Sequence, residues 1–520
     1  MRHSPLLYAN RPGARAGAEI AAPGISKEAA GSATARSSPT PKENPRTTVT
    51  HPSRYDAILI GAGQTGEPLA RALAGAGQRV LLIERDRLGG TCTNRGCTPT
   101  KTLVFSAYVA DLVRRAGDYG VQIPGPSSVD IARVLARKDA LVRDFREAVR
   151  ENLTGIDGLE LAFGEARLTD RNAVLLHERD GRERTLTAGR IILNVGARPA
   201  VPPIEGLSDV PFLDSTTILS LETLPEHLLV LGGGYIGLEF AQMFRRFGSR
   251  VTIIEANPHL LGADEDDDVT GEMARLLRED RIDVRLNTKA ERVRGTAGDL
   301  RLTVRAEDGP ATEALRGTHL LVATGRTPNT NDLGLDAAGV ETDERGYIKV
   351  NERLETSVPG IWAGGDAAGS PAFTHIAYDD FRVLRSQLIG DGSRTTRDRL
   401  VPQTVFTDPQ LGRVGMSEKQ ARVAGKNVRI AKVSARDLAR PRETGEARGF
   451  LKAVVDADTD EILGCAMFCR EGGEMMGAVT VALMAKLPYT ALRDGIFSHP
   501  TLVESLNNLF LSLDEEGKGR

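Results

Sequence analysis

The side chains with the clearest redox chemistry in this 520-residue sequence are two cysteines separated by four residues, Cys92 and Cys97. Two thiols at this spacing can close a small disulfide ring, and the thiolate is the form that reacts. Nearby positive charge lowers the pKa of a thiol, and Arg95 and Lys101 are close enough in the sequence to supply such charge. The pattern indicates a redox-active disulfide.

An inert disulfide or half of a zinc site is the structural alternative for these two cysteines. A zinc site is disfavoured because no matching CxxC or HxxxH pair occurs elsewhere in the sequence. Cys465 and Cys469 lie on or beside an apolar strand, where free cysteines behave as small buried hydrophobes. We therefore expect Cys92 and Cys97 to be catalytic, and Cys465 and Cys469 to lie in the core.

Two glycine-rich segments predict two dinucleotide sites. Each follows an apolar strand and opens a helix, at residues 61–66 and 232–237. The first glycine of such a motif makes the tight turn, the second admits a pyrophosphate close to the backbone, and the third allows close packing of helix on strand. The phosphates then lie at the helix N-terminus, where unpaired N–H groups favour negative charge. The glycines are Gly61, Gly63 and Gly66 in the first motif and Gly232, Gly234 and Gly237 in the second.

Each glycine motif is followed by a second strand that ends in an acid, Glu84 or Glu255, placed to bind a ribose hydroxyl. Ordinary turns without a ligand would require two glycine motifs and two acids to coincide by chance. A carboxylate at Glu255 favours a free 2′-hydroxyl and repels a 2′-phosphate, and residues 256–259 contain no arginine to hold such a phosphate. The sequence therefore predicts NADH rather than NADPH.

Composition limits the partners and the location. A net charge of -3 gives no excess of the basic residues that bind nucleic acid. The apolar runs are shorter than the about 20 residues that span a bilayer, and four cysteines in a chain this long do not make a secreted disulfide scaffold. We expect a cytoplasmic protein that acts on small molecules.

Residues 1–53 lack hydrophobic periodicity and predict a disordered extension rather than a transit peptide.

Further motifs extend these observations to a family. Residues 324–329 read TGRTPN, residues 362–366 read WAGGD and residues 499–504 read HPTLVE. With the cysteine and glycine motifs, they resemble the pyridine nucleotide-disulfide oxidoreductases, a family that includes glutathione reductase, dihydrolipoamide dehydrogenase and mercuric reductase. The resemblance runs from about residue 54 to 512.

The resemblance implies an α/β fold with two Rossmann-like domains, one for FAD and one for NAD(P), and a C-terminal α+β dimerisation domain. Strand-like segments followed by an apolar helix after residue 399 fit the last of these. The expected divisions are 54–200 and 330–398 for the FAD domain, 201–329 for the NAD(P) domain and 399–520 for the interface domain. Family members are homodimers, and dimerisation is expected to use residues 399–512.

The resemblance also assigns roles at the redox centre. Cys97 is implied to be the thiolate beside the flavin, and Cys92 the interchange thiol that meets the substrate. His499 is implied to be the general acid/base, supplied by one subunit to the disulfide site of the other and oriented by Glu504. Histidine suits this role because it exchanges protons near neutral pH.

Other family positions fall on cofactor-binding residues. The implied contacts are a Lys101–Glu239 pair near the flavin, Asp366 on the FAD ribityl chain and Tyr235 as a gate over the nicotinamide pocket. The remaining implied positions are Gly90 and Thr91 for FAD and Gly325 for NAD(P). No resident metal site is expected.

The motifs indicate the branch within the family less specifically than they indicate the family itself. The C-terminal residues 511–516 lack the vicinal cysteines of well-known mercuric reductases, residues 497–500 read FSHP where dihydrolipoamide dehydrogenases have HxHP, and soluble transhydrogenases lack the full cysteine pair. Residues 373–382 resemble the mercuric-reductase-like, reactive-chlorine-resistance flavoproteins linked to copper(II) reduction, with His375 in place of their tyrosine. The alternative is that this segment only packs beneath the flavin.

We therefore expect an FAD-dependent NAD(P)H oxidoreductase that reduces a metal ion or a small oxidant through the Cys92–Cys97 disulfide. The alternative is a dihydrolipoamide dehydrogenase or another reductase of low-molecular-weight disulfides. A non-catalytic FAD-binding redox sensor belongs to a different class, and it gives no reason for His499 and Glu504 to accompany the cysteines.

Overall fold

The computed structural model describes residues 54–307, 309 and 311–516. The extension expected at residues 1–53 lies outside the described residues. Among the described helices, none is both long enough and apolar enough to cross a membrane.

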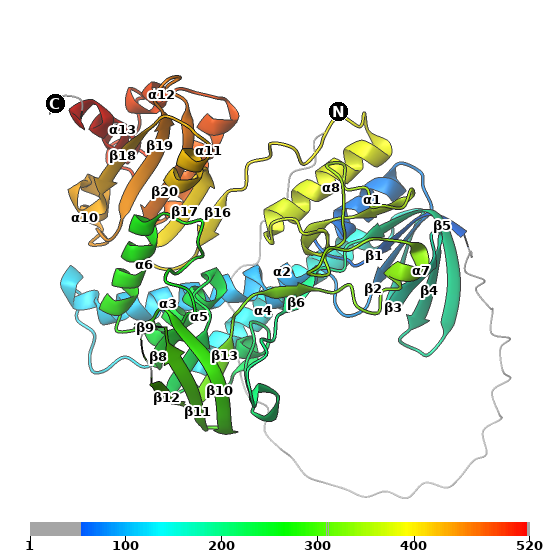
Figure 1. Ribbon diagram of the computed structural model, residues 1–520, viewed down its shortest axis with the longest axis horizontal. Coiled ribbons are helices and arrows are strands. Elements are labelled where there is room, and N and C mark those ends of the chain that lie inside the picture. The colour runs from blue at the N-terminus through cyan, green and yellow to red at the C-terminus, as the bar shows by residue number, and fades with distance from the viewer. Residues whose placement is uncertain (1–53, 308, 310, 517–520) are drawn as a thin grey trace, which may run out of the picture. The chain divides into compact units, whose positions relative to one another are not determined.

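The first sheet is built from two distant parts of the chain. Its strand order is β1-β2-β3-β4-β5-β15, and β1 also pairs in parallel with β5. Parallel pairing of Ile361 with Ile191 adds β15 to this sheet. The strands are β1 (Arg54–Ile60), β2 (Val80–Glu84), β3 (Leu159–Asp170), β4 (Ala173–Glu178), β5 (Glu183–Leu193) and β15 (Ile361–Ala363). The helices α1 (Gly66–Gly75) and α8 (Thr374–Ile389) pack side by side against its apolar side chains (Figure 1).

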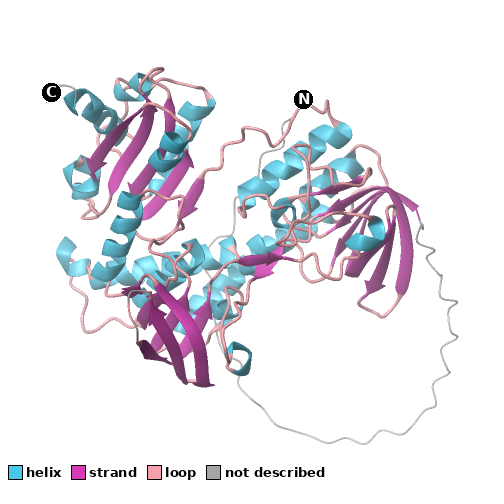
Figure 2. Ribbon diagram, viewed as in Figure 1, coloured by secondary structure: helices cyan, strands magenta, loops and turns pink. Residues whose placement is uncertain are grey.

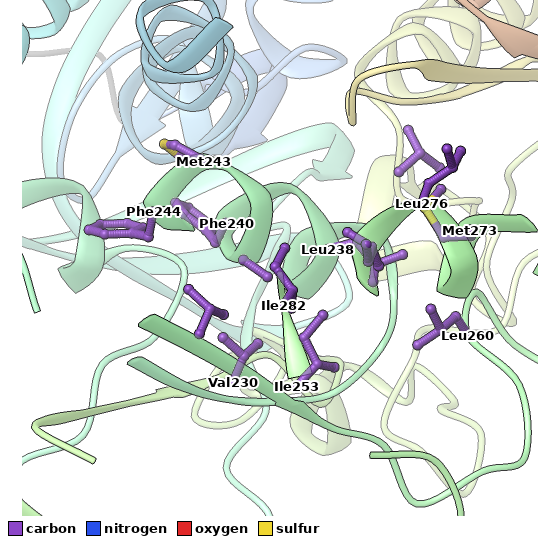
Figure 3. Close-up of a cluster of buried hydrophobic side chains, with 14 of the residues drawn as sticks. Val230, Leu238, Phe240, Met243, Phe244, Ile253, Leu260, Met273, Leu276 and Ile282 are labelled. Atoms are coloured by element: carbon purple, nitrogen blue, oxygen red, sulfur yellow. The ribbon is translucent and has the colours of Figure 1, made fainter. Parts of the chain in front are cut away.

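The second sheet is parallel and has the order β13-β7-β8-β9. Its strands are β7 (His227–Leu231), β8 (Arg250–Ile254), β9 (Asp283–Arg285) and β13 (His319–Val322). The helix α5 (Tyr235–Phe247) follows β7 and packs Leu238, Phe240 and Phe244 into a core with Val230 and Ile253 (Figure 3). The helix α6 (Asp267–Glu279) follows β8.

Smaller elements accompany this second sheet. The strands β10 (Thr288–Thr296), β11 (Asp299–Ala306) and β12 (Thr312–Gly317) form an antiparallel sheet, and β6 (Ala197–Pro199) pairs with β14 (Arg326–Pro328). Figure 2 distinguishes these strands from the surrounding helices and loops. The remaining helices of this part of the chain are α2 (Gly90–Arg95), α3 (Cys97–Arg114), α4 (Ile131–Leu153) and α7 (Leu335–Ala338).

The third large sheet is antiparallel, with the order β16-β17-β20-β19-β18. Its strands are β16 (Gln403–Val405), β17 (Gln410–Gly415), β18 (Val428–Ser434), β19 (Phe450–Asp456) and β20 (Ile462–Cys469). The accompanying helices are α9 (Glu418–Val423), α10 (Ala439–Glu443), α11 (Gly472–Met484), α12 (Tyr489–Arg493) and α13 (Ser505–Glu516). Cys465 and Cys469 lie buried in this core, and burial raises the pKa of each thiol to about 12. They are core residues, as the sequence predicts.

Candidate active site

The two cysteines of the predicted redox pair lie on two consecutive helices, a short one followed by a long one. Cys92 lies within α2, and Cys97 is the first residue of the 18-residue helix α3. Both are free thiols. A cysteine at a helix N-terminus is favoured as the thiolate because unpaired N–H groups and the helix dipole stabilise negative charge there. The Thr374 hydroxyl lies 3.2 Å from the Cys97 sulfur and adds a contact from α8.

The surroundings shift the pKa values of the two thiols in opposite directions. A hydrogen bond from Cys92 lowers the pKa of Cys97 to about 6, with Lys101 acting in the same direction and burial opposing it. The same hydrogen bond, together with burial, raises the pKa of Cys92. When both sulfurs are reduced, these shifts favour the thiolate at Cys97 and the thiol at Cys92.

Lys101 and Glu239 form an ion pair beside this thiolate. The Lys101 Nζ atom lies 2.7 Å from Glu239 Oε2, and 3% of the Glu239 side chain is exposed. The other carboxylate oxygen, Oε1, accepts a hydrogen bond of 3.0 Å from the Phe406 backbone N–H. The Phe406 ring also lies under the ammonium, 4.7 Å from centroid to Nζ. This arrangement holds a positive charge near Cys97.

A cavity of about 760 Å³ connects the first glycine motif to the cysteines. Its lining includes most of the residues expected to contact FAD, which are Gly61, Gly63, Glu84, Gly90, Thr91, Lys101 and Asp366, together with Cys92 and Cys97. Asp366 lies 3.4 Å from Arg326, a residue that the sequence analysis did not assign to the site. Burial raises the pKa of Asp366 and Arg326 opposes this rise.

The backbone around the first glycine motif fits FAD. A Cβ atom on Gly66 would lie 2.0 Å from the Gly61 carbonyl oxygen, so only glycine permits this approach of helix to strand. A Cβ atom on Gly90 would lie 2.9 Å from the Gly63 Cα atom, so two side-chain-free loops meet at the cavity wall. Glu84 accepts the Ala62 N–H at 3.0 Å and braces the turn. The residues expected at the phosphates, the ribose and the redox end of FAD thus line one cavity.

A second cavity, of about 980 Å³, lies at the second glycine motif. Its lining includes Gly232, Gly234, Tyr235, Glu255 and Gly325, as expected for a pyridine nucleotide site. A Cβ atom on Gly237 would lie 2.1 Å from the Gly232 carbonyl oxygen, while one on Gly234 would meet nothing within 4 Å. The third glycine therefore permits packing, and the second leaves the backbone open to a ligand.

Glu255 braces its own glycine turn. Its Oε2 atom accepts the Gly233 N–H at 2.6 Å, and its Oε1 atom accepts the Asn257 N–H at 2.8 Å. The structure adds cations that the sequence analysis missed, because Lys289 of β10, Arg326 and Arg413 line the same cavity. Arg326 is paired with Asp366 and Arg413 with Glu265. Thr288, the neighbour of Lys289, bonds the Glu255 carbonyl through its backbone N–H, at 2.9 Å, and no nearby sequence position indicates this approach.

Tyr235 lies between the two cavities and contributes to both linings, as does Arg326. The Tyr235 ring lies 5.8 Å from the Phe373 ring, centroid to centroid. Phe373 in turn stacks on His375, at 5.4 Å with an interplanar angle of 19°. His375 contacts the Pro402 carbonyl oxygen through Nε2 at 2.7 Å, and burial lowers its pKa. An aromatic row therefore runs from the boundary of the cavities along the start of α8.

His499 and Glu504 form the expected couple but stand apart from the cysteines of their own chain. His499 Nδ1 lies 2.8 Å from Glu504 Oε2, and 67% of the His499 side chain is exposed. Neither residue belongs to the lining of the two cavities described above. The other expected site residues, by contrast, are gathered at those cavities or directly behind them.

Comparison with known proteins decides the family. The sequence model described as "Pyridine nucleotide-disulphide oxidoreductase" matches residues 55–380, and the dimerisation-domain model of that family matches residues 401–510. The chain belongs to the pyridine nucleotide-disulfide oxidoreductases. Membership of this flavoprotein family implies FAD and a pyridine nucleotide as cofactors. The dimerisation domain supports a homodimer.

Individual members of the family cover nearly the whole described chain. The probable oxidoreductase RclA of Escherichia coli is 40% identical over 88% of this chain and 99% of its own. A structure titled as the Cu(II) complex of that HOCl-induced flavoprotein disulfide reductase superposes with a TM-score of 0.80, at 39% identity and the same coverage. The mercuric reductase of Streptomyces lividans is 33% identical over 87% of this chain and 94% of its own.

A relative named for disulfide chemistry is similarly close. The dihydrolipoyl dehydrogenase of Thermus scotoductus is 36% identical over 87% of this chain and 96% of its own. The predicted fold class and family are confirmed, and the oxidoreductase is mercuric-reductase-like, with FAD and a pyridine nucleotide as cofactors. Within the described residues, no cluster of three or more His, Cys, Asp or Glu side chains is arranged to hold a metal ion.

Proposed function

We propose that this oxidoreductase passes electrons from NADH through FAD and the Cys92–Cys97 disulfide to a metal ion or a small oxidant. The supporting observation is the division of the two thiols, with Cys97 as a stabilised thiolate in the FAD cavity and Cys92 as its proton-bearing partner. Bound FAD supplies the two-electron relay between nicotinamide and disulfide. In this relay, Lys101 balances the charge on Cys97, and Cys92 carries the proton.

The disulfide step balances as follows. Cleavage of the S–S bond takes up two electrons and one proton, and leaves Cys97 as the thiolate and Cys92 as the thiol. Lys101 compensates the charge on Cys97, and the Thr374 hydroxyl contacts its sulfur at 3.2 Å. Two one-electron metal ions, or one two-electron oxidant, then take the electrons. The disulfide forms again as Cys92 releases its proton.

The acceptor proposal draws on the relatives. RclA was solved as a Cu(II) complex, and other relatives are named mercuric reductases, so a metal ion is our first candidate. A low-molecular-weight disulfide such as lipoamide is the second candidate, because a dihydrolipoyl dehydrogenase is 36% identical. Both acceptors would react at Cys92, and they differ in whether a mixed disulfide or a metal thiolate forms there.

NADH is the proposed electron donor. Glu255 is 9% exposed, lines the nucleotide cavity and would repel a 2′-phosphate. Three cations line the same cavity, and the two arginines among them, Arg326 and Arg413, are paired with Asp366 and Glu265. In this proposal Lys289 acts against the preference that Glu255 sets. The compartment we propose is the cytoplasm, where reduced thiols persist.

The proton transfers at Cys92 are assigned to His499 of the partner subunit. The support is geometric, because the couple of His499 and Glu504 is well formed, exposed, and absent from the cavities of its own chain in the described structure. In this proposal Tyr235 covers the nicotinamide pocket and Asp366 holds the ribityl chain, as their positions in the cavity linings permit.

An acceptor panel tests the function. Holoenzyme with NADH would be assayed with copper(II), mercury(II), lipoamide and glutathione disulfide, for wild type, Cys92→Ser and Cys465→Ala. We expect turnover of a metal ion that is lost in Cys92→Ser and kept in Cys465→Ala, whose cysteine lies in the core. Turnover of lipoamide or glutathione disulfide far above that of the metals would contradict the first candidate and support the second.

A further inference from the structure

The helix α5 has a polar face that is as buried as its apolar one. The apolar side chains Phe240 and Phe244 pack into the core shown in Figure 3. Glu239, Gln242 and Arg246 follow one another at spacings of three and four residues, and so share another face. They are 3%, 4% and 6% exposed. Buried polar groups are costly unless they are bonded, so the partners of this face show what it holds.

Gln242 holds the chain segment between β16 and β17. Its Oε1 atom accepts the Asp408 backbone N–H at 2.7 Å, and its Nε2 atom donates to the Asp408 carbonyl oxygen at 2.9 Å. The amide thus satisfies both backbone groups of one residue, as a neighbouring strand would. Nε2 also donates to Asp280 at 2.7 Å, which fixes the orientation of the amide.

Arg246 strengthens the same attachment. It pairs with the Asp408 carboxylate at 2.7 Å, and its own carbonyl oxygen accepts a hydrogen bond of 2.6 Å from Arg114 of α3. The segment 406–408, the helix α5 and the cysteine-bearing helix α3 are therefore linked by side chains at one place.

The segment held in this way touches the redox centre. Two residues before Asp408, the Phe406 N–H donates to Glu239 Oε1 at 3.0 Å. The Phe406 ring packs against the Lys101 ammonium at 4.7 Å. Each end of the ion pair beside Cys97 thus has one contact from Phe406. A displacement of segment 406–408 would release both.

We propose that Gln242 is a positioning residue for the cysteine site, which acts by locking segment 406–408 so that Phe406 holds Glu239 and Lys101 in place beside Cys97. The inference rests on the redox role proposed for Cys97. The groups that act on Cys97 come from four elements: Cys92 on α2, Lys101 on α3, Glu239 on α5 and Thr374 on α8. Through segment 406–408, Gln242 affects the placement of Lys101 and Glu239 without contacting the Cys97 sulfur.

The test measures the titration of Cys97 in Gln242→Leu holoenzyme. In the two-electron-reduced protein, the long-wavelength absorbance of the thiolate beside the flavin would be followed against pH. Wild type should titrate at about 6. The variant should titrate about one unit higher, which is the lower end of the about 1 to 3 units that a nearby opposite charge contributes. Residue-resolved alkylation of Cys97 against pH gives a second reading that needs no electron transfer.

The matched control is Gln387→Leu. Gln387 also donates to two backbone carbonyl oxygens, those of Gly392 at 2.9 Å and Arg394 at 2.8 Å, but it lies near the end of α8 away from the cysteine site. It should keep the wild-type midpoint. Gln242→Asn, whose shorter amide cannot reach both backbone groups of Asp408, should shift the midpoint in the same direction by less, and it carries the test where Gln242→Leu does not fold.

A folded Gln242→Leu protein with the wild-type midpoint in both readings would overturn the positioning role. So would an unchanged midpoint in Gln242→Asn where Gln242→Leu does not fold. Loss of the absorbance band in wild type, with a shifted alkylation midpoint in the variant, would instead overturn the proposed relay and leave the positioning role supported.

Discussion

The Lys101 ammonium and the Glu239 carboxylate lie 2.7 Å apart, behind the cysteine pair and next to the backbone of Phe406. Because Glu239 is almost fully buried, removal of Lys101 would leave its charge without its partner. The Lys101 ammonium lowers the pKa of Cys97, while Glu239 opposes it.

Loss of Lys101 should therefore impair the thiolate. Lys101→Met is expected to raise the pKa of Cys97 from about 6 by about 1 to 2 units. On acidification, the Cys97 thiolate of the variant is therefore protonated at a higher pH than that of wild type. The measurement is the pH titration of thiolate absorbance in the reduced holoenzyme. Arg95→Gln is the control, because Arg95 pairs with Asp86 and is not among the groups that act on Cys97. Equal midpoints for Lys101→Met and wild type would refute the role of the ammonium.

The third glycine of the first motif should be intolerant of any side chain. Gly66→Ala places a Cβ atom 2.0 Å from the Gly61 carbonyl oxygen, so the helix must move away from the strand and the FAD phosphates lose their site. We expect purified protein with most of its FAD missing, measured by the ratio of flavin to protein absorbance. Gly75→Ala, on the same helix but with nothing within 4 Å of its Cβ, should retain full FAD. Full flavin content in Gly66→Ala would count against the assignment.

Nucleotide preference should depend on the charge of Glu255. Glu255→Gln keeps a side-chain acceptor for the Gly233 N–H but removes the repulsion of a 2′-phosphate. The preference for NADH over NADPH, measured as a ratio of kcat/KM values, should fall about tenfold, which corresponds to about 1.4 kcal/mol. Lys289→Met should change the ratio in the opposite direction. A wild-type enzyme that prefers NADPH would contradict the role proposed for Glu255.

Mixed dimers should reveal the origin of the acid/base. His499→Gln is expected to lower turnover about 10²- to 10⁴-fold, the usual contribution of general acid/base catalysis. Cys92→Ser should be inactive as well. Heterodimers that combine one subunit of each variant should regain one working site, because the intact cysteine pair then meets an intact histidine from the other subunit. Heterodimers without activity would place the histidine in the same chain as its cysteines.

The interface domain contains a buried lysine whose loss should destabilise the fold. Lys452, with 4% of its side chain exposed, lies 3.1 Å from Asp266, 3.0 Å from Asp268 and 2.9 Å from Glu418. Lys452→Met leaves these carboxylates without their shared cation, and we expect a loss of about 3 kcal/mol in the free energy of unfolding. Lys426→Met, at a more exposed pair with Asp456, should cost at most about 1 kcal/mol. Denaturant unfolding of both variants measures the difference.

The sequence was sufficient for those parts of the site that local backbone geometry determines. The glycines, the acids after the second strands and the cysteine spacing each carry their own physical signature within a few residues. Cys97 and Thr374, by contrast, are 277 positions apart, and only the fold brings the hydroxyl to the sulfur. The same holds for Lys289 beside Glu255.

Tertiary packing also decides the meaning of residues that look ordinary in sequence. Lys452 reads as a charge on an apolar strand, and its three carboxylate partners come from other segments. Gln242 reads as one polar residue on a helix, although it holds the backbone of a segment 166 positions away. No periodicity or motif identifies such partners, because the contacts depend on how the three large sheets and their helices come together.

Anaerobic titration of the holoenzyme with NADH tests the central claim most directly. At two electrons per subunit we predict the long-wavelength absorbance of the Cys97 thiolate beside oxidised flavin, two newly accessible thiols, and loss of this band in Cys97→Ser. Direct bleaching of the flavin at that point, with the Cys92–Cys97 disulfide still intact, would contradict the relay.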